Sequence, residues 1–350
     1  MDIYLQSFGA RLRSKDGLFE ITVPDISGTG NHKIAQHPVH EVESILLQPG
    51  TSVSTDALLL AFEGNVNILI LDKFGNPSGR ILPNRPSSTL LIWKNQLAVS
   101  LQKEGLEMAK SWIEIKIHER IQFLQKRCAY HSGAQAELIQ QNCMAMEVIL
   151  NRIRQLLITA HTPDIAGVIR GHEGAAGKMY YGTLAQLLPD EYQFEHRTPR
   201  NPTDLFNAFL NYGYGILYRI VENALLAAGI HPYIGFFHYD GYQNKSMVFD
   251  FIEQFRVFVE KNIFHLFSRK LSAWRHLQSS GSQYLLSTEA RQLIANTLRQ
   301  QLDAERPSLN NKKFAYKSFV RAQAIDLVPQ AVNNAHFGGP IFRSISLFVG

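Results

Sequence analysis

The feature that most constrains the fold of this chain is a change in hydrophobic periodicity after about residue 82. Before it, apolar residues form short runs rich in β-branched side chains, at Leu18–Val23, Ser44–Leu47 and Val66–Leu71. Clusters of Gly, Pro and Asn separate these runs, and one short helix is expected at Thr55–Phe62. Short runs bounded by turn residues predict β-strands, so residues 1–82 are expected to form a small β-rich domain.

Residues 83–88 are rich in Pro, Asn and Ser and are expected to form a linker. Beyond them apolar residues recur at spacings of three and four, which predicts helices. The expected helices are Leu90–Lys126, Ala134–Ala160, Pro202–Ala228 and Met247 to about Leu277. The third has Asn201 as a plausible N-cap and Pro202 at its first position. Residues 89–350 would therefore form a larger all-helical domain, which makes the chain an α+β protein.

The charge of the chain is unevenly distributed. The whole chain has 35 basic and 30 acidic residues; residues 1–90 hold 7 and 9 of them, which leaves 28 and 21 for the remainder. A polyanion would therefore bind the C-terminal part.

The sequence also limits the protein's location. The two cysteines, Cys128 and Cys143, have no metal-type spacing and are expected to be reduced, buried thiols. The N-terminus lacks the apolar core of a secretory signal, and no window approaches the ~20 apolar residues that span a bilayer. A cytoplasmic protein without a membrane anchor is expected.

The Gly-rich segment Gly171–Met179 invites comparison with a phosphate-binding loop. His172 stands where that motif has Gly, and Met179 stands where it has the metal-binding Ser or Thr. Nucleotide hydrolysis at this loop is therefore not expected. Its small residues are interpreted as a tightly packed helix start with Glu173 near the N-terminus, where the helix dipole would favour a carboxylate for purely structural reasons.

A second candidate region begins at His238, within the aromatic stretch Tyr233–Asp240. A histidine there could simply belong to the core. A polar turn follows, and then Asp250 and Glu253 at a spacing of three, which places both carboxylates on one helix face. Two carboxylates in an apolar stretch repel each other unless a cation compensates them. That cation could be a side chain, Arg256 or Lys245, or a divalent metal; a histidine with carboxylates and no cysteine suits Mg²⁺ or Mn²⁺.

In these segments the sequence resembles the CRISPR-associated spacer integrase, the larger of the two universal CRISPR adaptation proteins. The agreement is close from Arg170 to Arg256 and looser in the N-terminal domain, and it thins after about residue 275. The matching segments, in order, are Glu173–Ala176 with Tyr180 and Tyr181, Arg197–Pro202, Asn207, Leu210–Tyr214, Ala228–Pro232, Gly235–His238 and Asp250–Arg256.

The resemblance implies that Glu173, His238 and Glu253 are the catalytic, metal-binding triad, with Asp250 as an additional acidic ligand. It implies an Mg²⁺- or Mn²⁺-dependent enzyme that joins the 3′-hydroxyl ends of a double-stranded prespacer to CRISPR repeat DNA by transesterification. It also implies a homodimer, with two dimers bridged by the small second adaptation protein. The N-terminal domain is net acidic, rich in short strands with exposed edges and without a basic cluster, so it is expected to form the dimer rather than to hold DNA. A structure-specific nuclease of DNA repair is the alternative function.

The basic residues of the second domain are expected to contact DNA phosphates. One run without intervening acidic residues contains Lys312, Lys313, Lys317 and Arg321. The alternative interpretation of this run is a solvated helix face. Tyr180, Tyr181, Tyr212, Tyr214 and Tyr218 could stack on bases, although the last three have helical spacing that also fits a core. The expected DNA-binding residues are Lys178, Arg197, Arg200, Lys245, Arg256, Lys312, Lys313, Lys317 and Arg321.

Overall fold

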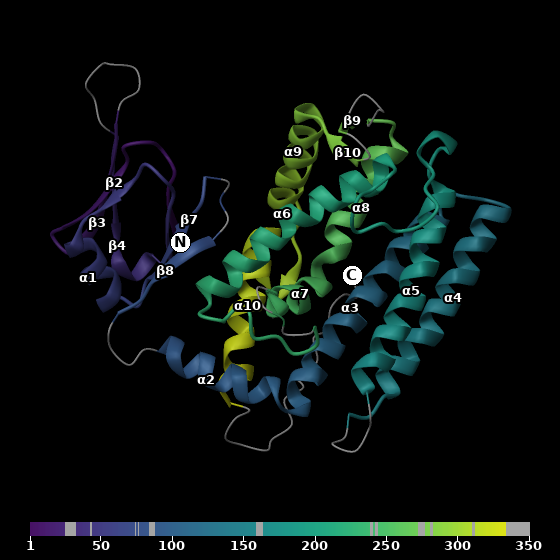
Figure 1. Cartoon of the computed structure of the whole chain (residues 1–350), viewed down its shortest axis with the longest axis horizontal. Helices are drawn as coiled ribbons and strands as arrows, with labels where there is room; N and C mark the ends of the chain where they lie inside the picture. Colours follow the sequence, from purple (N-terminus) through teal and green to yellow (C-terminus); the bar gives the residue numbers. More distant parts are fainter. Residues whose placement is uncertain are drawn as a thin grey trace. The chain divides into compact units, whose positions relative to one another are not determined.

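The computed structural model divides the chain into two compact units, Met1–Trp93 with Glu222–Ile230, and Lys94–Val221 with His231–Gly350 (Figure 1). It describes residues 1–24, 33–42, 44–73, 75, 77–83, 88–158, 164–238, 241, 244–271, 277–280, 283–309 and 312–333. Residues 84–87 of the expected linker and all residues after 333 lie outside these ranges.

The first unit contains two four-stranded sheets, which confirms its expected β-rich character. One sheet has the order β1 (Asp2–Leu5), β5 (Ser44–Leu47), β7 (Asn67–Leu71) and β8 (Pro77–Ile81), parallel except for β8. The other has the order β4 (Lys33–Pro38), β3 (Leu18–Val23), β2 (Arg11–Lys15) and β6 (Ser52–Val53). The expected strands 18–23 and 44–47 have the predicted bounds.

The helix α1 (Thr55–Glu63) packs its buried face against these strands. It begins where predicted because the hydroxyl of Ser54 accepts a hydrogen bond from the Ala57 amide at 3.2 Å. The core of the unit is made of aliphatic residues and one aromatic residue, among them Ile3, Leu12, Phe19, Ile45, Ala61 and Ile68.

The second unit is mostly helical, as expected. Its helices are α3 (Lys103–Cys128), α4 (Ala134–Gln155), α5 (Ile165–Leu187), most of α6 (Leu205–Ala227), α7 (Ser246–Phe251), α8 (Arg256–Ser268), α9 (Thr288–Ala304) and α10 (Tyr316–Asn333), with α2 (Ser88–Ser100) entering from the first unit. Two short antiparallel pairs interrupt the helical pattern, β9 (Leu277–Ser280) with β10 (Gln283–Leu286), and β11 (Ser308–Leu309) with β12 (Lys312–Lys313).

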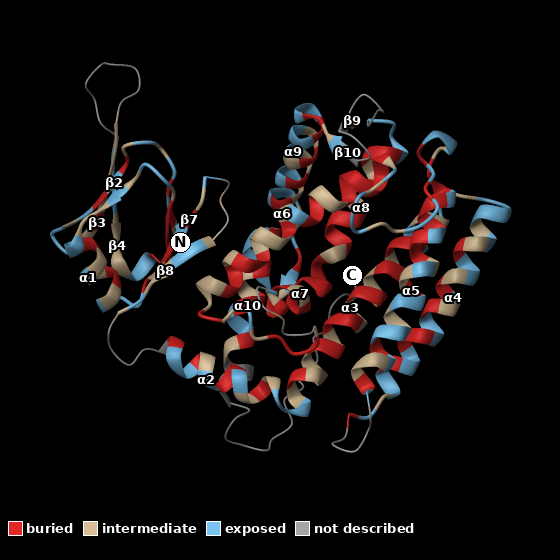
Figure 2. Ribbon diagram, viewed as in Figure 1, coloured by how far each residue is buried: buried red, intermediate tan, exposed pale blue. Residues whose placement is uncertain are grey.

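Helices α3, α4 and α5 lie side by side, and α3 is buried along much of its length (Figures 1 and 2). The buried residues of α3 include three charged ones, Lys110, Lys116 and Arg120. Because buried charge must be paired, these residues show where the helical unit concentrates its polar interactions.

Two helix boundaries of the second unit differ from the prediction because of local contacts. The expected helix 90–126 breaks between α2 and α3, where a Cβ on Gly105 would lie only 2.7 Å from the Val99 carbonyl oxygen. The start of α6 is set by Asp204, whose carboxylate accepts from the Asn207 amide at 2.7 Å, whereas Asn201 has a φ of +48°. Asn201 and Pro202 therefore precede the helix.

The expected helix 247–277 is also divided. It consists of α7, the 3-10 turn η3 (Ile252–Phe255) and α8, and it ends at Ser268. The helix expected to reach Ala160 ends at Gln155, and Ala160 itself lies outside the described residues.

Candidate active site

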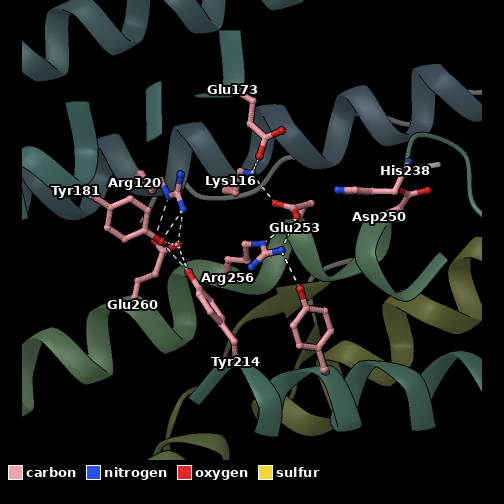
Figure 3. Close-up of polar contacts among 11 residues, drawn as sticks. Lys116, Arg120, Glu173, Tyr181, Tyr214, His238, Asp250, Glu253, Arg256 and Glu260 are labelled. Atoms are coloured by element: carbon pink, nitrogen blue, oxygen red, sulfur yellow. Dashed lines mark hydrogen bonds and ion pairs between the residues drawn. The ribbon is translucent and has the colours of Figure 1, made fainter. Parts of the chain in front are cut away.

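The ammonium of Lys116 on α3 lies between two carboxylates from distant parts of the chain. It donates to Glu173 Oε1 on α5 and to Glu253 Oε2 on η3 (Figure 3). Lys116 and Glu253 are almost fully buried, whereas 25% of the Glu173 side chain is exposed. Two of the four expected site residues thus converge on one positive charge, and the site reaches solvent on the Glu173 side.

Glu253 has a second cationic partner one turn along the chain. Arg256 Nε donates to Glu253 Oε1 at 2.8 Å, and Arg256 Nη2 donates to the Tyr218 hydroxyl at 3.1 Å. Burial alone would raise the pKa of the Glu253 carboxyl, but Arg256 and then Lys116 outweigh it and hold that pKa well below its usual range. Glu253 is therefore a permanently ionised carboxylate in the interior.

His238 and Asp250 form the other half of the site. Asp250 Oδ1 and His238 Nδ1 are 2.6 Å apart, and the Asp250 side chain is fully buried. The His238 side chain is 36% exposed, so it is not a core histidine. With Nδ1 facing Asp250, its Nε2 points away from that carboxylate, on the side of Glu253 (Figure 3).

Asp250 also holds the backbone that carries the histidine. Its Oδ2 accepts from the amides of Phe236 and Phe237 at 2.5 and 2.9 Å, and its Oδ1 accepts from the His238 amide at 2.9 Å. Both oxygens are thus committed to the 236–238 segment. In this structure Asp250 orients His238 from behind, which is how second carboxylates commonly support metal-binding histidines.

The segment before His238 is fixed by two further features. A Cβ on Gly235 would lie 2.5 Å from Ser246 Cβ and 3.0 Å from Asp250 Oδ2, so only glycine fits there. The buried Gln96 amide donates to the carbonyls of His231 and Ile234 at 2.9 and 2.8 Å, and its oxygen accepts from the His231 amide at 2.8 Å. The position of His238 therefore depends on contacts from outside its own segment.

Glu173 lies in the middle of α5, because the helix starts at Ile165 after Asp164, whose carboxylate accepts from the Gly167 amide at 2.9 Å. The expectation of a carboxylate at a helix start was wrong, so the helix dipole does not explain Glu173. The ion pair with Lys116 accounts for the position of the Glu173 carboxylate.

The donor types of the site fit a hard divalent cation. Glu173 and Glu253 already accommodate one positive charge between them, and the His238 imidazole points toward the side of Glu253 in Figure 3. As arranged here, no group of three or more His, Cys, Asp or Glu side chains among the described residues is spaced to hold a metal ion, and the cation between the carboxylates is Lys116. Metal ligation by these residues stays a prediction.

A second, closed ion-pair cluster lies one turn further along α3. Arg120 donates to both oxygens of Glu260 on α8 at 3.0 and 2.5 Å. The hydroxyls of Tyr181 and Tyr214 donate to Glu260 Oε1 at 3.1 and 2.6 Å (Figure 3). Burial would raise the pKa of Glu260, but Arg120 lowers it below the usual value. Sequence analysis missed this cluster and Lys116, although charged residues within the apolar segment Trp112–Ile121 were a usable signal.

The expected DNA-binding residues fall into two groups. Arg197 donates to the side chains of Asn207 and Asn211 at 2.9 and 2.6 Å, and Arg256 is bound to Glu253. For these two, the observed partners lie within the protein. The exposed residues among the others are Lys178, Arg200, Lys312, Lys313 and Lys317, while Lys245 and Arg321 are partly buried.

The tyrosines are mostly structural in this arrangement. Tyr180 and Tyr181 are buried, so base stacking by these two does not fit the structure. Tyr214 is buried too, which agrees with the core position that its helical spacing favoured. Both cysteines are free thiols; Cys143 is buried as expected, and Cys128 is only partly buried. None of the described helices combines the length and apolarity that a transmembrane span requires.

Fold and site together define a class of protein with a β-rich unit and a helical unit whose central helices bring paired carboxylates beside an oriented histidine. Residues 3–300 match the family model of CRISPR associated protein Cas1. The chain belongs to the Cas1 family, which confirms the resemblance seen in the sequence.

Individual relatives agree with this assignment. The chain is 27% identical over 337 residues to CRISPR-associated endonuclease Cas1 1 of Archaeoglobus fulgidus, covering 94% of this chain and 95% of the relative. It is 30% identical over 259 residues to CRISPR-associated endonuclease Cas1 2 of Pyrobaculum aerophilum, covering 73% and 79%.

Solved structures share the fold. A casposase bound to its integration product superposes with a TM-score of 0.74 at 20% identity, covering 95% of this chain and 96% of the casposase. A Cas1 protein from Thermotoga maritima superposes with a TM-score of 0.66 at 18% identity, covering 95% and 96%. The β-rich and helical division is thus that of the Cas1 structures.

Proposed function

We propose that this protein is a metal-dependent DNA integrase and endonuclease of CRISPR adaptation. It joins the 3′-hydroxyl ends of prespacer DNA to the CRISPR repeat by transesterification. The observation that carries the proposal is the convergence of Glu173 and Glu253, 80 positions apart in sequence, on a single cation. Asp250 orients His238 in the same unit. A scaffold that only bound DNA would gain nothing from carboxylates facing its anionic ligand.

Glu173, Glu253 and His238 Nε2 would hold Mg²⁺ or Mn²⁺, with Asp250 supporting the histidine. The bound metal would stabilise the negative charge that develops on the phosphate oxygens during displacement. The chain's own residues prepare the site: Asp250 keeps the proton on Nδ1 of His238, and Arg256 keeps Glu253 ionised.

An exposed face of α5, on the side of the helix away from Glu173, offers DNA a surface. Gly171, Gly174 and Gly182 lie on this face, and a Cβ on any of them would meet nothing within 4 Å among the described atoms. Packing inside the protein therefore does not account for these helical glycines, which cost helix stability. Lys178 lies on the same face, between Gly174 and Gly182, and such a surface suits the close approach of a phosphodiester backbone.

The proposed partners are DNA and the small second adaptation protein, since relatives of the same fold are titled as a Cas6-RT-Cas1–Cas2 complex and a Cas1–DNA complex. The proposed assembly is a homodimer through the N-terminal unit, with two dimers per integration complex. Light scattering on a chain lacking residues 1–82 should show a monomer; an intact dimer would contradict this part.

The function is tested with the full chain, its small partner, Mn²⁺, a duplex with free 3′-hydroxyls and a repeat-containing target. Joined products are expected, and a 3′-terminal dideoxynucleotide should abolish joining without weakening binding. If blocked ends are still joined, or if only cleavage is observed, the alternative of a repair nuclease is favoured.

A further inference from the structure

The strongest unexplained feature of the site is that both oxygens of Glu253 already have cationic partners. Lys116 donates to Oε2 and Arg256 donates to Oε1. Each oxygen keeps a lone pair, but a divalent cation that binds there meets the positive charge of these partners close by. A divalent cation that uses Glu253 is therefore in competition with them.

Arg256 is poorly suited to move. Its guanidinium also donates to the Tyr218 hydroxyl at 3.1 Å and lies 4.9 Å from the centre of the Tyr214 ring. These contacts fix its planar group independently of Glu253.

Lys116 differs because its two partners are the two carboxylates among the three proposed metal ligands. One displacement of its ammonium frees an oxygen on Glu173 and an oxygen on Glu253 at the same time. A lysine ammonium is a compact charge on a flexible stem, so it can retreat without moving α3.

We propose that Lys116 is the built-in counter-cation of this site: it holds Glu173 and Glu253 together without metal and competes with the divalent metal for them. This inference rests on the proposed function, because it concerns the same metal-binding carboxylates. It makes Lys116 a positioning residue that sets metal affinity, since two unpaired carboxylates would otherwise repel and separate.

The test is a calorimetric titration of Mn²⁺ into the full chain and its variants. Lys116→Met removes the competing charge at similar volume and should tighten Mn²⁺ binding on the order of tenfold, as expected for a unit charge at contact distance. Lys116→Arg keeps the positive charge, and its planar guanidinium can donate to both carboxylates at once. It should therefore weaken Mn²⁺ binding. Opposite changes from these two variants would support competition.

Lys110→Met is the matched control. Lys110 is a buried lysine on the same helix, about 9 Å along the axis from Lys116, and its ammonium donates to the Arg154 and Leu156 carbonyls at 3.2 and 2.9 Å. Its loss should leave the Mn²⁺ affinity unchanged.

Thermal unfolding gives a readout that does not depend on activity. Lys116→Met should melt below the wild type in a chelator and should gain more from saturating Mn²⁺ than the wild type does. If Lys116→Met fails to fold, Lys116→Arg alone decides, and unchanged or tighter binding by that variant refutes competition. Wild-type protein that binds no Mn²⁺ would overturn the proposed metal-dependent function as well. Wild-type binding without tightening in Lys116→Met would overturn only the role of Lys116.

Discussion

The two ion-pair clusters on α3 contain similar residues but differ in their access to solvent. Arg120 and Glu260 are both buried, and two tyrosine hydroxyls complete the hydrogen bonding of the carboxylate. The Lys116 cluster lies one turn away and also contains a buried ion pair, but its second carboxylate, Glu173, reaches solvent. The closed cluster has nothing left to bind, whereas the open one is accessible to a ligand.

The difference teaches that burial of an ion pair does not by itself indicate function. A buried pair costs desolvation free energy and contributes stability only when its remaining hydrogen bonds are satisfied. The Arg120 cluster meets this condition within the protein. In the Lys116 cluster one ammonium holds together two carboxylates that repel each other. A divalent cation can take the place of that ammonium.

The largest expected effect is on stability, in the closed cluster. Glu260→Met should leave Arg120 buried without its carboxylate and lower the free energy of unfolding by about 3–5 kcal/mol. Urea denaturation followed by far-ultraviolet circular dichroism measures it. Arg120→Met combined with Glu260→Met should recover much of the loss; a loss below about 1 kcal/mol for the single variant would mean that the cluster is not structural.

In the open cluster the effect should fall on activity instead. Glu173→Gln should reduce DNA joining by on the order of 10²-fold or more, because charge stabilisation at the phosphate is lost. Its free energy of unfolding should change by less than about 1 kcal/mol, since the side chain is partly exposed. Glu147→Gln, at an exposed position on α4, is the control, and joining at wild-type rates by Glu173→Gln would remove Glu173 from the site.

A smaller effect, on Mn²⁺ affinity, should distinguish a residue that orients His238 from a residue that binds the metal itself. Asp250→Asn removes the negative charge and replaces one of the two acceptor oxygens by a donor, so it should weaken Mn²⁺ binding by about 10–100-fold, as losses of supporting carboxylates do. His238→Ala should weaken it further, because the nitrogen itself is removed. Calorimetric titration of Mn²⁺ into both variants compares their losses of affinity. An unchanged affinity in His238→Ala would exclude ligation by this histidine.

The last prediction concerns pH and the partly buried His265 on α8. Burial first, and then Arg127, Arg269 and Lys261, lower the pKa of His265 to about 4. Because its folded pKa lies below the unfolded value of about 6.5, the unfolded state binds more protons between these values. The contribution of His265 is complete above pH ~6.5 and is lost as pH falls toward ~4. Denaturation curves of His265→Phe across this window should show a shallower loss than the wild type; an equal slope would show that His265 does not titrate with folding.

The sequence by itself determined the division of the fold and the family of the protein. Runs of β-branched residues separated by turns predicted β3 and β5 with their bounds, and spacing of three and four predicted the helical unit. These features are local, so neighbouring residues in the chain are enough to specify them. The ordered set of motifs from Arg170 to Arg256 identified the family without any coordinates.

Only the tertiary structure decided which charges meet. Lys116, Glu173 and Glu253 come from three separate elements, and no spacing along the chain relates them. The spacing of Asp250 and Glu253 suggested one shared face, but the 3-10 turn at Ile252–Phe255 lets Asp250 serve the 236–238 backbone while Glu253 joins Lys116 and Arg256. Periodicity reports which face of a helix is buried, whereas the partner of a buried charge is set by the helix that packs against it.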